Sequence, residues 1–129
     1  MSQRIDGPGF KSFEADEAIT LYTRVKLDAD GKITIAGLAE RDIGTLQTHG
    51  AGAAGEWVPV KLNSATGTHK VRVKEAVAAG AILYTETTGE LQDTDQATAF
   101  VWGTALEAAT ADNDVIECMY GIQPDIAST

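Results

Sequence analysis

Short stretches in which apolar and polar side chains alternate recur along the whole chain, separated by glycine, proline, asparagine and aspartate. Alternation places one set of side chains on each face of a half-buried strand. The pattern predicts strands over residues 19–27, 32–36, 42–48, 57–62, 68–74, 81–85, 99–103 and 115–120. Many short strands separated by turn residues predict a mainly-β fold, a small single-domain β-barrel or sandwich.

The turn residues refine this picture. Residues 28–31 (Asp-Ala-Asp-Gly) separate the first two predicted strands and carry the Asp-Gly signal of a hairpin. Pro59 cannot donate a ladder hydrogen bond, so its strand is expected at a sheet edge or at a bulge. At most one short helix is expected, with residues 106–111 as the best candidate; residues 74–80 form either a helical turn or a loop.

The two ends differ from the middle. Residues 7–9 (Gly-Pro-Gly) disfavour both helix and sheet, which predicts an extended or mobile N-terminal arm over residues 1–13. Residues 14–122 then form the single β domain. Residues 123–129 are polar, contain Pro124, and are expected to fray as a C-terminal tail. No tandem repeat is recognised in the sequence.

Charge is divided unevenly along the 129 residues. The chain has 10 Lys and Arg against 19 Asp and Glu, and the last basic residue is Lys74. An acidic C-terminal half argues against nucleic-acid binding, because phosphate contacts need a basic surface. It suits a solvated surface, or an acidic face that docks on a basic partner. No apolar run approaches the roughly 20 residues of a membrane-spanning helix, so no membrane partner is expected.

Candidate chemical motifs fail on their context. Residues 50–55 match the Gly-rich dinucleotide pattern, but strand spacing follows where a helix should begin, so a flexible loop is expected. Residues 28–31 resemble the start of a calcium loop, but the glycine comes early and no glutamate stands at the twelfth place. His49 and His69 lack partners at metal-ligand spacing. Cys118 lies in an apolar run and is expected to be a small buried side chain.

We therefore expect no catalytic residue, no metal and no cofactor, and we predict that the protein is not an enzyme. An active site assembled in space, involving His49 or His69, stays open as an alternative. Lys70, Arg72 and Lys74 share one face of their strand, either a solvated face or an interface. Trp57 is expected to be a core or interface anchor.

From Phe10 to Tyr120 the order of small motifs is similar to that of the capsid decoration, or cement, proteins of tailed phages. The likeness is carried by glycine and small-residue spacing rather than by reactive groups. Trp102 departs from the pattern, because a smaller apolar residue is expected before Gly103. The motifs are Phe10-Lys11-Ser12-Phe13 with residues 14–18, residues 24–27, Ile43-Gly44, Gly55 before residues 57–60, residues 80–84, Gly89-Glu90-Leu91, and Gly103-Thr104-Ala105-Leu106 through Glu117.

The resemblance implies a β-tulip-like decoration fold and a non-catalytic protein that stabilises the shell from its outer surface at local symmetry axes. It implies the major capsid protein as partner, a homo-oligomer with a trimer favoured over a dimer, and a place on the virion after assembly in the bacterial host cytoplasm. The alternative is a carbohydrate- or receptor-binding β module displayed on the virion surface, which an exposed Trp57 would serve. The expected capsid or subunit interface comprises Phe10 and Phe13, which anchor the arm, with Trp57, Lys70, Arg72 and Lys74.

Overall fold

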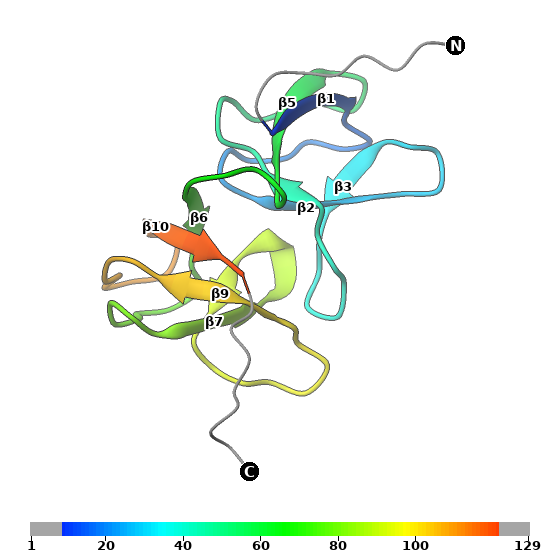
Figure 1. The fold of residues 1–129 in the computed structure, drawn as a ribbon. Coiled ribbons are helices and arrows are strands. Elements are labelled where there is room, and N and C mark those ends of the chain that lie inside the picture. Colours follow the sequence, from blue (N-terminus) through cyan, green and yellow to red (C-terminus); the bar gives the residue numbers. More distant parts are fainter. Residues whose placement is uncertain (1–8, 122–129) are drawn as a thin grey trace.

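The computed structural model describes residues 9–121, which form two curled antiparallel sheets of five strands each (Figure 1). The first sheet contains β1 (Phe10–Glu14), β2 (Arg24–Leu27), β3 (Ile33–Ile35), β4 (Gly44–Thr45) and β5 (Trp57–Leu62). The second contains β6 (His69–Arg72), β7 (Ile82–Thr85), β8 (Leu91–Gln92), β9 (Val101–Ala105) and β10 (Val115–Tyr120). The helical element of the described residues is one 3-10 turn, η1 (Thr87–Gly89). The mainly-β class is confirmed.

The two sheets have the same topology. Their strand orders, β1-β5-β4-β2-β3 and β6-β10-β9-β7-β8, are one order shifted by five strands. The isolated bridge between Ile19 and Ala51 recurs between Val77 and Ala109, 58 positions later at both residues (19 to 77, 51 to 109). The prediction of no tandem repeat was therefore wrong. We call residues 10–62 the first half and residues 69–120 the second half.

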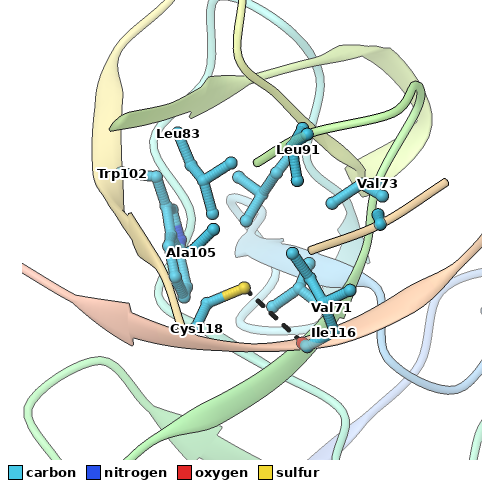
Figure 2. Close-up of a cluster of buried hydrophobic side chains, with 10 residues drawn as sticks. Val71, Val73, Leu83, Leu91, Trp102, Ala105, Ile116 and Cys118 are labelled. Carbon is cyan, nitrogen blue, oxygen red and sulfur yellow. Dashed lines mark hydrogen bonds between the residues drawn. The ribbon is translucent and has the colours of Figure 1, made fainter. Parts of the chain in front are cut away.

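Each half has its own hydrophobic core, because the inward positions of its strands meet inside its own curled sheet. The first core includes Val25, Ile33, Leu46, Val58 and Val60. The second includes Val71, Leu83, Leu91, Trp102, Ile116 and Cys118 (Figure 2). Cys118 Sγ lies 3.5 Å from the Ile116 carbonyl oxygen and is fully buried, which confirms the prediction of a small buried side chain.

Local chemistry explains the hairpin between β2 and β3. Asp28 Oδ1 accepts from the backbone N–H groups of Asp30 and Lys32, at 2.9 and 3.1 Å. Gly31 has φ +79°, a left-handed conformation that glycine adopts without steric cost. The predicted hairpin is confirmed. In the second half η1 occupies the same place between β7 and β8.

Three sequence predictions fail for local reasons. The strand expected over residues 19–27 begins only at Arg24, because Tyr22 has φ +67° and interrupts extended backbone. Residues 106–111 form no helix; Ala109 instead exchanges backbone hydrogen bonds with Val77. Finally, β5 is not an edge strand, since it lies between β1 and β4. Pro59 is tolerated because β4 ends at Thr45, opposite Lys61, and does not extend alongside it.

The predicted N-terminal arm, residues 1–13, lies partly outside the described residues, and the whole of the predicted tail, residues 123–129, lies outside them. Phe10–Glu14, however, forms β1, which pairs antiparallel with β5 from Phe10 opposite Lys61 to Glu14 opposite Trp57. Phe13 is half-buried and packs against the first core. Residues 10–13 of the predicted arm therefore have extended backbone and pair within the first sheet.

A polar interface joins the halves, which lie one above the other in Figure 1. Arg24 of the first half is fully buried and donates from Nε to the Glu90 carbonyl at 3.0 Å and from Nη2 to the Glu86 carbonyl at 2.7 Å. Its Nη1 lies 3.2 Å from Asp42 Oδ1. Burial lowers the pKa of Arg24, and Asp42 opposes that effect. An arginine stays charged under such a shift, so the pair forms a buried salt bridge.

Asp42 continues this network into the second half, because its Oδ2 accepts from Trp102 Nε1 at 3.1 Å. At the free edge of β6, backbone hydrogen-bonding groups are paired with a side chain of the first half. Gln47 accepts from the Lys70 N–H through Oε1 at 2.9 Å and donates to the Lys70 carbonyl through Nε2 at 2.7 Å. The amide of Gln47 thus replaces a neighbouring strand, and the two halves are held in one arrangement.

No helix of the described residues has the length and apolar character needed to cross a membrane.

Candidate interaction surfaces

A groove of about 390 Å³ runs along β1 in the first half. It is bounded by residues of β1, by the β2–β3 turn at Asp30, Gly31 and Lys32, and by Trp57. Trp57 is 65% exposed, the most open of the large apolar side chains described. Its exposure follows from alternation along β5, because its neighbour Val58 points into the core and is fully buried.

Charged and aromatic groups are interleaved along this groove. Lys32 Nζ lies 3.6 Å from Glu14 Oε2, which links the turn to β1. Lys11 Nζ lies 5.9 Å from the centre of the Phe13 ring, a cation–π geometry. An exposed indole beside paired charges can bind an apolar anchor ringed by polar groups, or a sugar ring. Two of the predicted interface residues, Phe13 and Trp57, line the groove, whereas Phe10, on the same strand as Phe13, does not.

The predicted basic face is not one free cationic cluster. Val71 and Val73 are fully buried, so the expected alternation along β6 is confirmed. Arg72, however, points at the other half: its Nη2 donates to Thr23 Oγ1 at 3.0 Å. Its Nη1 lies 3.5 Å from Glu90 Oε2. Lys70 and Lys74 are exposed on either side of Arg72. Arg72 therefore belongs to the contact between the halves, whereas the two lysines lie on the surface.

The cysteine and the two histidines make contacts that belong to the packing and hydrogen bonding of the fold. Burial raises the pKa of the Cys118 thiol to about 12, so the nucleophilic thiolate is absent at neutral pH. His69 is almost fully buried, and its Nδ1 lies 3.1 Å from Thr45 Oγ1. Burial, with a smaller contribution from Lys61, lowers the pKa of His69 to about 4. His49 is exposed, and its Nδ1 lies 3.0 Å from the Gly50 carbonyl.

Three carboxylates gather at the β2–β3 turn: Asp16, Asp28 and Asp30 have oxygens within 4.8 Å of one another. A hydrogen bond between Asp16 and Asp28 raises the pKa of Asp16 and lowers that of Asp28. The group is largely exposed, and Asp28 already accepts two backbone hydrogen bonds of the turn. These contacts account for the aspartates as turn residues.

Sequence reasoning missed a second exposed surface, on the outer face of the second sheet. Ile82 of β7 and Met119 of β10 flank Thr104 of β9 in register. We call these three residues the outer row. Ile82 is 54% exposed and Met119 is 40% exposed, and Val101 lines a small hollow with Ile82 and Thr104. The sequence signal for this surface was an apolar residue, Ile82 or Met119, at an outward strand position where a polar residue is usual.

Comparison with solved structures gives a likeness at the level of the fold. The fold is similar to that in the crystal structure of the head fiber gp8.5 N base in bacteriophage phi29, with a TM-score of 0.70 and 16% sequence identity. The likeness covers 87% of this chain and 92% of that chain. No protein-family model matches the sequence. No curated protein matches it either.

Proposed function

We propose that this protein is a structural component of a phage virion that attaches to the outer surface of the capsid and reinforces the shell. The observation that carries the proposal is the fold shared with a head fiber base of a bacteriophage over nearly the whole of both chains. Fold likeness at this identity is an analogy of architecture. The motif order similar to that of decoration proteins is an independent line of support for the same class.

The surface chemistry supports attachment rather than transformation of a substrate. Trp57 offers a large, rigid anchor in a groove that also carries charged side chains. Interfaces are typically dominated by a few such aromatic anchors. An oligomer placed at a local symmetry axis would repeat this contact, so that individually modest contacts combine into tight attachment. We include a homo-oligomer in the proposal, with the major capsid protein as partner.

The direct test mixes purified full chain with undecorated capsids and images the particles by electron cryo-microscopy. We expect added density on the outer surface at symmetry axes. Trp57→Ala should lower occupancy, whereas the control Leu27→Ala, which removes a 46% exposed side chain elsewhere on the first sheet, should not. Capsids that stay bare at saturating protein would overturn the proposal.

The exposed Trp57 beside carboxylates also fits the second candidate, a carbohydrate- or receptor-binding module on the virion. An indole face stacks on the apolar face of a sugar ring, and neighbouring carboxylates accept from its hydroxyls. Glycan-array binding that Trp57→Ala abolishes, together with bare capsids, would favour this candidate over cement activity.

A further inference from the structure

The outer row of the second half has a counterpart in the first half. There, Arg24 of β2 and Lys61 of β5 flank Thr45 of β4 in register. In the second half, Ile82 and Met119 flank Thr104 in the same way. The middle residue is threonine in both rows, while both flanking residues change from charged to apolar.

In the first half this row is the docking surface for the second half. Arg24 donates to the carbonyls of Glu86 and Glu90, and Thr45 contacts His69. Lys61 donates from Nζ to the carbonyl of Thr68, the residue directly before the second half. Thus, this position on the curled sheet already carries one interface. The second half has the same surface at the same place and, among the described residues, nothing lies over it.

We propose that the outer row, Ile82, Thr104 and Met119, is the surface through which copies of this chain associate with one another. The row carries no charged side chain, and depletion of charge is characteristic of the centre of a protein interface. Val101, which is also exposed, extends the apolar area next to Ile82. This inference deepens the oligomer included in the proposed function and names its contact surface.

The surface that best fits against the outer row is the outer row of another copy. Suppose that a second copy docked as the second half docks on the first. The residues equivalent to His69, Glu86 and Glu90 would then be Lys11, Asp28 and Lys32 (11 to 69, 28 to 86, 32 to 90). The backbone carbonyls of Asp28 and Lys32 would then face Ile82, in place of the Glu86 and Glu90 carbonyls that accept from Arg24. Ile82 has no donor, so these carbonyls would lose hydration without gaining partners. An apolar row against an apolar row avoids that cost and gives a closed, symmetric oligomer.

Charge gives this association a distinctive salt dependence. The chain has no lysine or arginine after Lys74, so copies that meet through the second half repel one another around the row. Added salt screens that repulsion, and the oligomer should therefore become tighter as ionic strength rises. A partner with a basic surface would show the opposite trend, because its attraction to the acidic half would be screened.

The test uses the purified full chain without capsids, so that it can fail separately from the proposed function. We expect sedimentation equilibrium to show an oligomer for the wild type. The double substitution Ile82→Arg with Met119→Lys supplies the side-chain types of the first half's row, and each change should weaken association by about tenfold or more. Leu27→Lys, at an equally exposed apolar position outside the row, is the matched control and should leave the oligomer intact.

A wild type that remains monomeric at about 100 μM would overturn the proposal, because the dissociation constant for self-association would then be too high for the row to act as an interface. A double variant that is folded by circular dichroism and associates like the wild type would also overturn it. Should that variant fail to fold, Thr104→Cys provides a second route through a bifunctional maleimide. Cross-linking between copies supports the row, and its absence in an oligomeric sample places the interface elsewhere.

Discussion

Arg24 in the first half and Ile82 in the second occupy the same position of the same strand, yet they differ in every physical respect. Arg24 is buried, charged and hydrogen-bonded to five groups, whereas Ile82 is exposed and apolar. The backbone register around them is the same, with threonine as the cross-strand neighbour in each case. The comparison shows that the sheet fixes where an interface can form, while the side chain fixes which partner it accepts.

A polar row is suited to a partner that is always present. The carbonyl groups of Glu86 and Glu90 are delivered to Arg24 by the same chain, at fixed places, so that buried hydrogen bonds can be satisfied. An apolar row tolerates inexact partners, because burial of apolar surface is not directional. Four predictions test this contrast between the halves, from the largest expected effect to the smallest.

The first prediction breaks the interface at its centre. Arg24→Ala should destabilise the protein by about 3–5 kcal/mol, because Asp42 would remain buried without its cation and four carbonyls would each lose a hydrogen bond. Ile82→Ala, at the equivalent position, should change the free energy of unfolding of the monomer by less than about 1 kcal/mol. Urea unfolding of both variants, at a concentration that keeps them monomeric, measures the difference. Equal losses would mean that the interface contributes nothing particular to stability.

The second prediction uses pH to break the interface. The unfolded chain protonates His69 below its ordinary pKa of 6.5, but the folded protein resists protonation down to about pH 4. Neutral His69 therefore makes its full contribution to the free energy of unfolding above pH 6.5. This contribution is lost as the pH falls towards 4, by roughly 3 kcal/mol in total. Urea unfolding across this range should show the loss. His69→Gln should remove this part of the slope and leave the part due to carboxylates; an unchanged slope would exclude His69 as its source.

The position of His69 sharpens the comparison, because its counterpart in the first half is Lys11 (11 to 69). Gln47 Nε2 donates to Thr45 Oγ1 at 2.8 Å, and the same hydroxyl oxygen lies 3.1 Å from His69 Nδ1. His69 Nε2 is buried and has no hydrogen-bond partner among the described residues, and the imidazole packs edge-on with the rings of Trp102 and Tyr120, at centroid distances of 5.8 and 6.5 Å. Burial, with a smaller contribution from the charge of Lys61, disfavours a second proton on the ring and so lowers the pKa of His69.

The third prediction concerns a feature that both halves share. A Cβ atom at Gly44 would lie 2.3 Å from the Lys61 carbonyl oxygen, and one at Gly103 would lie 2.0 Å from that of Met119. Gly44→Ala and Gly103→Ala should each cost about 2 kcal/mol, because backbone rather than a flexible side chain must move. The control is Gly52→Ala, whose nearest neighbour is the Glu56 carboxylate, and it should stay within about 0.5 kcal/mol of the wild type. Thermal melting of the three variants decides the point.

Alternation of side chains was sufficient to predict most strands, but not the repeat or the surfaces. The halves are equivalent in strand order and in their isolated bridges, whereas residues at matching positions differ in type, as Tyr22 and Gly80 do at one left-handed position. Similarly, alternation cannot tell an outward Trp57 from an inward Trp102, since both stand in apolar stretches. The contacts of Arg72 could not be predicted either. Its partners are Thr23 of the first half and Glu90, which follows η1 in the second half, and only folding brings them next to it.

The smallest predicted effect tests whether the repeat extends to backbone conformation. Gly55 (φ +95°) and Asn113 (φ +72°) are counterparts (55 to 113), and each donates its N–H to the matching carbonyl, of Ala15 and of Val73, at 2.8 Å. A Cβ at Gly55 would meet nothing within 4 Å, so conformation alone should decide which residues fit. Gly55→Asn should therefore stay within about 0.5 kcal/mol of the wild type, while Gly55→Val should cost about 1–2 kcal/mol in urea unfolding. If both variants lost the same stability, side-chain contacts rather than the left-handed turn would govern the site, and the equivalence of the two turns would be limited to their hydrogen bonds.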